Sequence, residues 1–211
     1  MARKLLVVVD PQIDFTSPDG ALSVKDAHLA FDNINKLLNS DEFVLKVITQ
    51  DWHPANHVSF ASTHGAEMFT KKQTKQGTKF ITQMMWPTHC VAGTKGAEIT
   101  PMIESERANL IVRKGTDPYR ENYSALEYAY EGESTFNDNT PFYEMFTNLD
   151  IDEVYVCGFA TDYCVAQTAR SFDEIVPTFI VSDACKAVDE NNAIKVLADL
   201  GIETVYTAGT A

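Results

Sequence analysis

The sequence lacks long apolar runs and has none of the biased segments that mark membrane-bound or disordered chains. No window approaches the roughly 18 consecutive apolar residues of a membrane-spanning helix, so no membrane protein is expected. Internal repeats, low-complexity tracts and linkers are also missing. The apolar run that begins at Leu5 is short, ends at Asp10-Pro11 and has no small-residue cleavage site. It therefore predicts a first strand rather than a signal peptide.

Cysteine is scarce, and its spacing excludes a CxxC metal or redox motif. The sequence contains Cys90, Cys157, Cys164 and Cys185. Because there is no secretory signal, reduced thiols in the cytoplasm are the default expectation. We therefore expect a cytoplasmic protein without structural disulfides.

Positive charge is in deficit, with 17 Lys and Arg against 30 Asp and Glu and a net charge of -13. Nucleic acids and anionic membrane surfaces repel such a protein, so neither is expected as a partner. The charge says little about a neutral small substrate. A homo-oligomer is compatible with a chain of this size.

Apolar runs of strand length alternate with helical patterns. The runs cover residues 5–9, 43–48, 110–112, 154–157, 178–181 and 204–206. Between the first two runs and between the last two, apolar residues recur at helical spacing: Leu29, Ile34, Leu37 and Leu38, then Ala193, Ile194, Val196, Leu197 and Leu200, with Gly201 as a helix stop. This alternation predicts an α/β fold with a doubly wound, mostly parallel sheet flanked by helices. With 211 residues, we expect a single domain over residues 1–211.

Two segments fit the alternation poorly. Residues 54–101 match no strand–helix unit and read as a long loop, which in a compact domain is usually functional. Within this loop region, residues 63–79 form a Lys- and Thr-rich insert of unassigned role. Residues 124–149 predict a helix, a polar turn at 132–140 and a second helix.

Reactive side chains stand at the carboxyl ends of the predicted strands, where ligands bind in open α/β sheets. The first strand ends at Asp10, the third at Lys114, and the fourth leads to Cys164 in the first turn of a predicted helix. A helix N-terminus and a nearby ammonium favour a thiolate, and a carboxylate can accept the thiol proton. Together the three indicate acyl transfer, although a lone cysteine is more often a buried structural residue. The other cysteines are interpreted as structural.

A second group of side chains suits a metal ion. Asp51 and His53 follow the second strand, and His89 lies in the long loop. One carboxylate and two imidazoles can bind a divalent transition metal such as Zn, Fe or Mn and leave positions open for water or a ligand. Because His57 and His64 lie in the same loop, the residues alone do not fix the ligand set. Such an ion could bind a pyridine nitrogen directly.

Aromatic residues cluster near the same positions and could stack on a flat apolar ring. They are Phe15, Trp52, Trp86, Tyr123 and Tyr163. For any one of them, filling of the core is an equally good interpretation.

A series of motifs in this sequence resembles nicotinamidases of the isochorismatase-like cysteine hydrolase family. The motifs are Asp10-Pro11-Gln12-x-Asp14-Phe15, Asp51-Trp52-His53-Pro54-x-x-His57-x-Ser59-Phe60, Trp86-Pro87-Thr88-His89-Cys90-Val91-x-Gly93-Thr94-x-Gly96-Ala97-Glu98, Lys114-Gly115-Thr116-Asp117-Pro118 and Gly158-x-Ala160-Thr161-Asp162-Tyr163-Cys164-Val165. They extend in order over most of the chain, from about residue 5 to residue 206.

The resemblance implies a role for each candidate residue. Cys164 would be the nucleophile, Asp10 its general base and Lys114 the third member of a catalytic triad. The implied metal ligands are Asp51, His53 and His89, together with water and with Ser59 acting through a water. The backbone N–H groups of Ala160 and Cys164 would form the oxyanion hole, with a cis peptide before Ala160. The ring-contacting positions would be Phe15, Trp86, Tyr123, Ala160 and Tyr163.

The implied reaction is hydrolysis of a small aromatic amide, nicotinamide, to nicotinate and ammonia through a cysteine thioester. Two alternatives stay open at this point. The chain could be another isochorismatase-like hydrolase that acts on a different small amide or an enol ether, or it could be a non-catalytic binding module.

Overall fold

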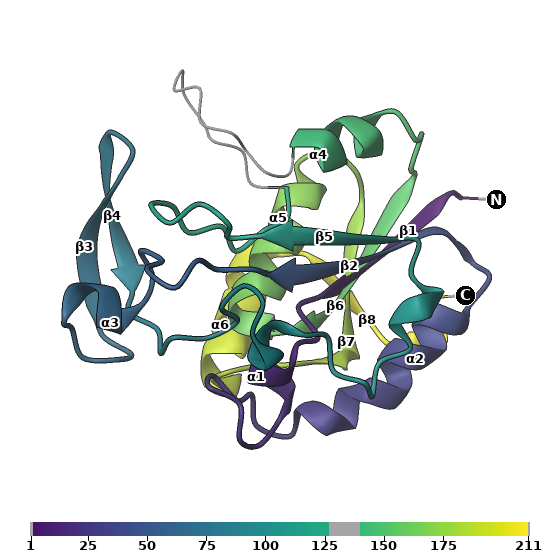
Figure 1. Ribbon diagram of the computed structural model, residues 1–211. Coiled ribbons are helices and arrows are strands. Elements are labelled where there is room, and N and C mark those ends of the chain that lie inside the picture. Colours follow the sequence, from purple (N-terminus) through teal and green to yellow (C-terminus); the bar gives the residue numbers. More distant parts are fainter. Residues whose placement is uncertain (1, 127–139, 211) are drawn as a thin grey trace.

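Parallel strands carry the fold in the computed structural model, which describes residues 2–126 and 140–210. Six strands form one sheet in the order β5-β2-β1-β6-β7-β8 (Figure 1). Their bounds are Lys4–Val9 for β1, Phe43–Asp51 for β2, Leu110–Lys114 for β5, Glu153–Phe159 for β6, Thr178–Lys186 for β7 and Glu203–Val205 for β8. Every neighbouring pair is parallel. Each strand overlaps one of the predicted apolar runs, which confirms the parallel α/β sheet.

Helices cover the sheet. The α-helices are α1 (Ile13–Thr16), α2 (Phe31–Asn39), α3 (Ala61–His64), α4 (Thr140–Thr147), α5 (Ala166–Asp173) and α6 (Glu190–Leu200). Short 3-10 turns span Ala27–Ala30, Lys95–Ala97, Ser105–Arg107 and Thr207–Gly209, and a π-helical turn spans Thr161–Val165. Helix α2 packs against β1 and β7, whereas α5 packs against β6 and β7. None of the helices in the described ranges has the length and apolarity needed to cross a membrane.

Two positions on the predicted apolar helix faces lie on the surface. Leu29 is 57% exposed because it precedes α2, in a 3-10 turn where the spacing of the α-helix does not apply. Ile194 is 69% exposed. Ala193 lies on the buried side of α6, and consecutive side chains of a helix point about 100° apart, so Ile194 points away from the core. Gly201 ends α6 with a positive φ of 68°, as predicted.

The central strand β1 fixes where the reactive residues emerge. Residues Leu5–Val9 of this strand are fully buried between β2 and β6. Val9 lies opposite Gly158 of β6, which has a φ of +111°. A Cβ atom at Gly158 would lie 2.2 Å from the Val9 carbonyl oxygen. Only glycine therefore allows the two strands to approach at the end where Asp10 leaves β1.

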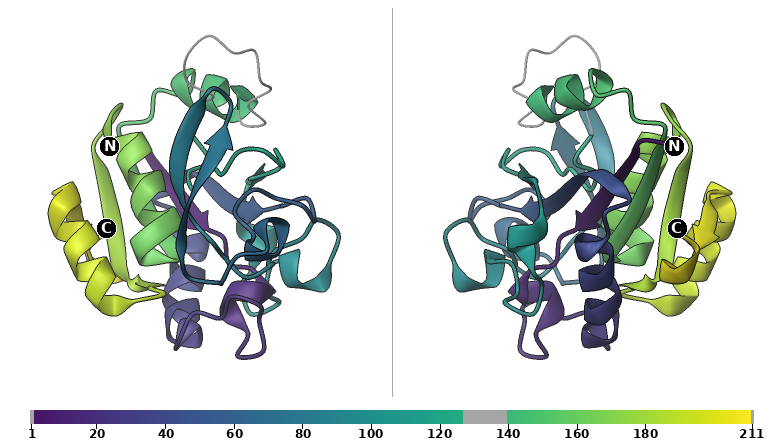
Figure 2. Two further views of the ribbon diagram at one scale, coloured as in Figure 1. Left: turned by 90° about the vertical axis from the view of Figure 1, so that its left-hand side faces the viewer. Right: turned by 90° about the vertical axis from the view of Figure 1, so that its right-hand side faces the viewer.

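The long loop predicted for residues 54–101 contains an antiparallel hairpin, so that prediction is wrong in part. The hairpin consists of β3 (Lys71–Gln76) and β4 (Lys79–Met84). It stands away from the main sheet, on the side opposite the two chain ends (Figure 1 and Figure 2). The sequence gives no apolar alternation here because the buried side chains of the two strands are polar: Thr74, Gln76 and Gln83.

The prediction for residues 124–149 can be compared with the structure only in part. Helix α4 confirms the second predicted helix. Most of the first predicted helix and nearly all of the turn lie outside the described residues. The single-domain assignment stays a prediction.

Candidate functional site

The buried ammonium of Lys114 brings the ends of four neighbouring strands together. Its Nζ atom lies 2.8 Å from Asp10 Oδ2 and 3.4 Å from Cys164 Sγ, and it also pairs with Asp51 Oδ1. Asp10 follows β1, Asp51 ends β2, Lys114 ends β5, and Cys164 lies beyond β6. The distances between one carboxylate oxygen of Asp10, one of Asp51 and the Cys164 sulfur are all within 4.8 Å. The predicted acid, cation and thiol therefore meet.

Burial and the ammonium set the charge states of the two carboxyl groups differently. Burial raises the pKa of Asp10 to about 6, and Lys114 only partly opposes this effect. Burial also acts on Asp51, but the charges of Lys114 and His53 outweigh it and hold the pKa of Asp51 well below its usual range. Burial would lower the pKa of Lys114, yet Asp10 and Asp51 raise it well above its usual value. The cation is thus retained between two carboxyl groups.

The Cys164 thiol differs from the sequence-based expectation of a stabilised thiolate. Burial raises the pKa of this thiol well above its usual value, Lys114 only partly opposes the shift, and the negative charge of Asp10 adds to it. The resting group is therefore a thiol that needs a base. Asp10 Oδ1 accepts a hydrogen bond from Thr49 Oγ1 at 2.6 Å, and Oδ2 lies 2.8 Å from the Lys114 ammonium. Because burial raises the pKa of Asp10 to about 6, this carboxyl group is the base available to the thiol.

Asp51, His53 and His89 form a cluster that fits a metal ion. Their candidate ligand atoms lie within 4.8 Å of one another. His53 Nδ1 lies 2.8 Å from the Gly115 carbonyl oxygen, and His89 Nδ1 lies 2.7 Å from the Pro87 carbonyl oxygen. Because a carbonyl only accepts, each Nδ1 donates, and in the neutral ring each Nε2 keeps a lone pair that can bind a metal. These Nε2 atoms lie 3.5 and 4.0 Å from Asp51 Oδ2.

The protonation of His89 also suits metal binding. Burial, followed by the charge of His53, lowers the pKa of His89 to about 4. This imidazole is therefore neutral near pH 7, which is the form that ligates a metal.

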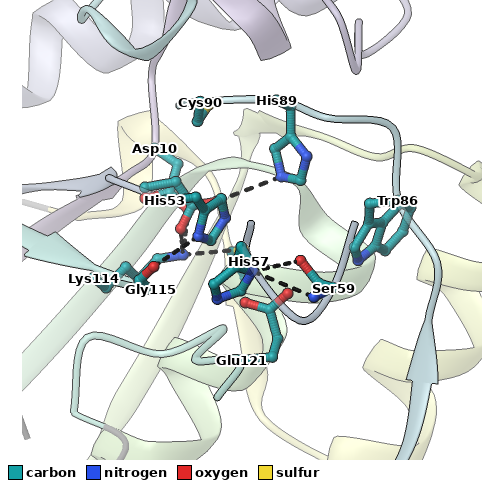
Figure 3. Close-up of polar contacts among 12 residues, drawn as sticks. Asp10, His53, His57, Ser59, Trp86, His89, Cys90, Lys114, Gly115 and Glu121 are labelled. Atoms are coloured by element: carbon teal, nitrogen blue, oxygen red, sulfur yellow. Dashed lines mark hydrogen bonds and ion pairs between the residues drawn. The ribbon is translucent and has the colours of Figure 1, made fainter. Parts of the chain in front are cut away.

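His57 lies against the cluster but has both ring nitrogens engaged. Its ring stacks on that of His53 at a centroid distance of 4.1 Å. Its Nδ1 lies 2.8 Å from Ser59 Oγ (Figure 3). Its Nε2 lies 2.9 Å from the Arg120 carbonyl oxygen. His57 also groups with His53 and Glu121, whereas His64 Nε2 contacts the Val58 carbonyl oxygen. Among the described histidines, the geometry therefore favours His53 and His89 as ligands beside Asp51.

Several residues of the motifs fix the positions of the candidate metal ligands, although no role could be assigned to them from the sequence. The Gln12 side chain donates to the Asp51 carbonyl oxygen and accepts from its backbone N–H, both at 2.7 Å. Asp14 accepts a hydrogen bond from the backbone N–H of Cys90, which follows His89. A Cβ atom at Gly115, whose φ is +64°, would lie 2.4 Å from the His53 ring, so glycine is required there.

A pocket opens above Cys164 and Asp51. Its lining consists of Phe15, Leu22, Asp51, Trp86, His89, Glu121, Tyr123, Ala160, Tyr163, Cys164 and Val188. All the predicted ring-contacting positions are among them. Leu22, Glu121 and Val188 were not predicted because they lie outside the conspicuous motifs. Trp52 does not line the pocket but lies under the Arg113 guanidinium, 3.9 Å from its ring centroid.

The segment that carries Cys164 has the expected backbone. The Phe159–Ala160 peptide bond is cis, as the resemblance implied. Asp162 accepts hydrogen bonds from the backbone N–H groups of Val188 and Asp189, which ties the π-helical turn to the start of α6. Ala160 and Cys164 both border the pocket, and the oxyanion hole formed by their backbone N–H groups stays a prediction.

Several known proteins are similar to this chain in sequence and fold. Residues 4–209 match the isochorismatase domain family. A nicotinamidase of Acinetobacter baylyi is 40% identical over 192 residues, which cover 90% of this chain and 84% of that protein. The crystal structure of the yeast nicotinamidase bound to the inhibitor nicotinaldehyde has 29% identity and a TM-score of 0.85, and the match covers 96% of this chain and 99% of that one.

The pyrazinamidase of Pyrococcus horikoshii, whose structure is in complex with zinc, is a further neighbour. It has 30% identity and a TM-score of 0.75, and the match covers 97% of this chain and 99% of that one.

Replacement of Lys114 by Met should destabilise the protein strongly. The change leaves Asp10 and Asp51 buried without their cation, which typically costs about 3–5 kcal/mol. Arg170→Met is the matched control, because its pair with Glu174 has side chains that are 62% and 71% exposed, and such pairs contribute about 0.5 kcal/mol or less. Urea unfolding of both variants in the presence of a chelator measures the difference. Equal unfolding free energies for the two variants would contradict this electrostatic arrangement.

Proposed function

This chain belongs to the isochorismatase family, and from that premise we propose that it hydrolyses nicotinamide to nicotinate and ammonia. The observation that carries the proposal is the meeting of a thiol, a carboxyl group and an ammonium at the base of an aromatic-lined pocket. A curated relative at 40% identity is a nicotinamidase, which supports hydrolysis of this amide. The bound nicotinaldehyde of the yeast neighbour supports a pyridine ring as the substrate's apolar part.

Acylation begins with the transfer of the Cys164 proton to Asp10. The raised pKa of Asp10, about 6, suits a base that must accept a proton and later return it. The thiolate then attacks the carboxamide carbon and forms a tetrahedral oxyanion. The Ala160 and Cys164 backbone N–H groups hold this oxyanion, and one such donor typically contributes about 3 kcal/mol. Lys114 stabilises the thiolate while it forms.

Release of ammonia and of the acid completes the cycle. Asp10 returns its proton to the amide nitrogen, the C–N bond breaks, and a thioester to Cys164 remains. Asp10 then takes a proton from a water molecule, and the water oxygen attacks the thioester carbon. The carbon–sulfur bond breaks, and the proton held by Asp10 returns to the sulfur. The acid leaves and gives its remaining proton to ammonia, which yields nicotinate.

The pocket orients the ring for this attack. Phe15, Trp86, Tyr123 and Tyr163 offer apolar surfaces on which a pyridine ring can pack. Asp51, His53 and His89 would hold one divalent transition metal, such as Zn, Fe or Mn. Such an ion supplies a Lewis-acid contact for the ring nitrogen when it is bound. Zinc in the Pyrococcus horikoshii neighbour supports this assignment.

Replacement of Cys164 by Ala should abolish turnover but leave substrate binding measurable. The change removes the nucleophile and retains the rings of the pocket, so the rate should fall by at least about 1,000-fold. Ammonia release measures turnover on nicotinamide, pyrazinamide and other aromatic carboxamides, and pyruvate release from isochorismate tests the enol-ether alternative. Cys185→Ala is the matched control because this buried thiol lies in β7 and does not line the pocket. Near wild-type turnover by Cys164→Ala would refute the mechanism.

Loss of His89 should remove a tightly bound divalent metal. Wild-type protein loaded with zinc and dialysed should retain about one ion per chain, and His89→Ala should retain far less because one of the three protein ligands is gone. Elemental analysis of the dialysed proteins measures this directly. His28→Ala is the control, because His28 is exposed. Equal zinc content in His89→Ala and wild type would exclude His89 as a ligand.

A further inference from the structure

The β3–β4 hairpin carries two buried glutamines that the proposed mechanism does not use. Gln76 is 5% exposed and Gln83 is 4% exposed, although the neighbouring lysines of the hairpin are exposed. Glutamine is mostly found at protein surfaces, and a buried amide is costly unless it is hydrogen-bonded. The partners of these two side chains therefore indicate what the hairpin does.

The two glutamines form a hydrogen-bond chain from the hairpin to the pocket. Gln76 Nε2 donates to Gln83 Oε1 at 3.2 Å, and Gln83 Nε2 donates to the Tyr123 hydroxyl at 3.2 Å. Gln76 Oε1 accepts a hydrogen bond of 3.1 Å from the backbone N–H of Glu121. Glu121 and Tyr123 both line the pocket. The hairpin thus contacts the pocket residues Glu121 and Tyr123 through two hydrogen bonds.

The Tyr123 hydroxyl also links the hairpin to the other aromatic rings of the pocket. Trp86 Nε1 donates to the Tyr123 hydroxyl at 3.0 Å. The ring centroids of Trp86 and Tyr163 lie 4.8 Å apart, and those of Tyr123 and Tyr163 lie 5.9 Å apart. The orientation of Tyr123 is therefore coupled to the other two rings on which a substrate ring would pack.

We propose that Gln83, supported by Gln76, is a positioning residue that sets the affinity of the pocket for the substrate ring. This inference rests on the proposed function. Neither glutamine lines the pocket, and the groups that perform the chemistry, Cys164 and Asp10, are held by Lys114 and not by the hairpin. Loss of the Gln83 amide therefore weakens ring binding and leaves the chemical steps nearly unchanged.

The test compares Gln83→Met with Gln73→Met on nicotinamide. Met has a similar volume to Gln but lacks the amide, so Gln83→Met should raise KM by about tenfold, the effect of one buried hydrogen bond, and change kcat by less than about twofold. Gln73 lies on the same hairpin but is exposed and bonds only to Thr82 among the described residues. Gln73→Met should leave both constants unchanged.

A double-mutant cycle shows whether Gln83 acts through the Tyr123 hydroxyl. In a Tyr123→Phe background the hydroxyl is gone, so Gln83→Met should then change KM by less than about twofold. A full tenfold change in that background would overturn the inference. Gln76→Met removes the hydrogen bond that Gln76 donates to Gln83, so it should also raise KM. This variant replaces Gln83→Met in the test if Gln83→Met does not fold.

The outcomes separate the inference from the function on which it rests. Wild-type protein that releases no ammonia from nicotinamide overturns the proposed function, and the inference with it. Active wild type with equal KM values for Gln83→Met and Gln73→Met overturns the inference alone. A fall in kcat at unchanged KM in Gln83→Met also overturns it.

Discussion

The ion pairs of one buried lysine are the constraint on which the site depends. Lys114 is fully buried and lies between Asp10 and Asp51, both of which are also buried. Two carboxyl groups this close and this deeply buried could not both carry charge without a cation between them. Because the residues come from β1, β2 and β5, the ion pairs also tie three neighbouring strand ends together. Cys164, which follows β6, completes the set.

The same lysine affects its two carboxyl neighbours unequally, and this difference divides their roles. Asp51 also faces His53 and His89, so its pKa is lowered and it remains a carboxylate suited to a metal ion. Asp10 lacks such neighbours, so burial dominates and its pKa is raised towards neutrality. Pairs of acids with divergent pKa values are a general way to obtain a base and a fixed charge in one site. The arrangement favours Asp10 as the proton carrier.

The sheet and the meeting of Asp10, Lys114 and Cys164 could be predicted from the sequence because parallel strands end at one edge. The choice of His89 over His57 could not be predicted from the residues alone, because it depends on which ring nitrogens already have partners. The hairpin and its glutamines were missed for a different reason. Their buried side chains are polar, and their partners Glu121 and Tyr123 lie about 40 residues away, so no local pattern marks them.

The account depends most on Asp10, in the cluster around Lys114, as the base that accepts the Cys164 proton. The pH dependence of kcat/KM on nicotinamide tests this claim most directly. The pKa of Asp10 is raised to about 6, so the carboxylate that must accept the Cys164 proton is present above that pH and lost below it. We expect kcat/KM to fall about tenfold per pH unit below pH 6, while circular dichroism shows that the protein stays folded. A kcat/KM that stays constant from pH 7 to pH 5 would contradict the assignment of Asp10 as the base.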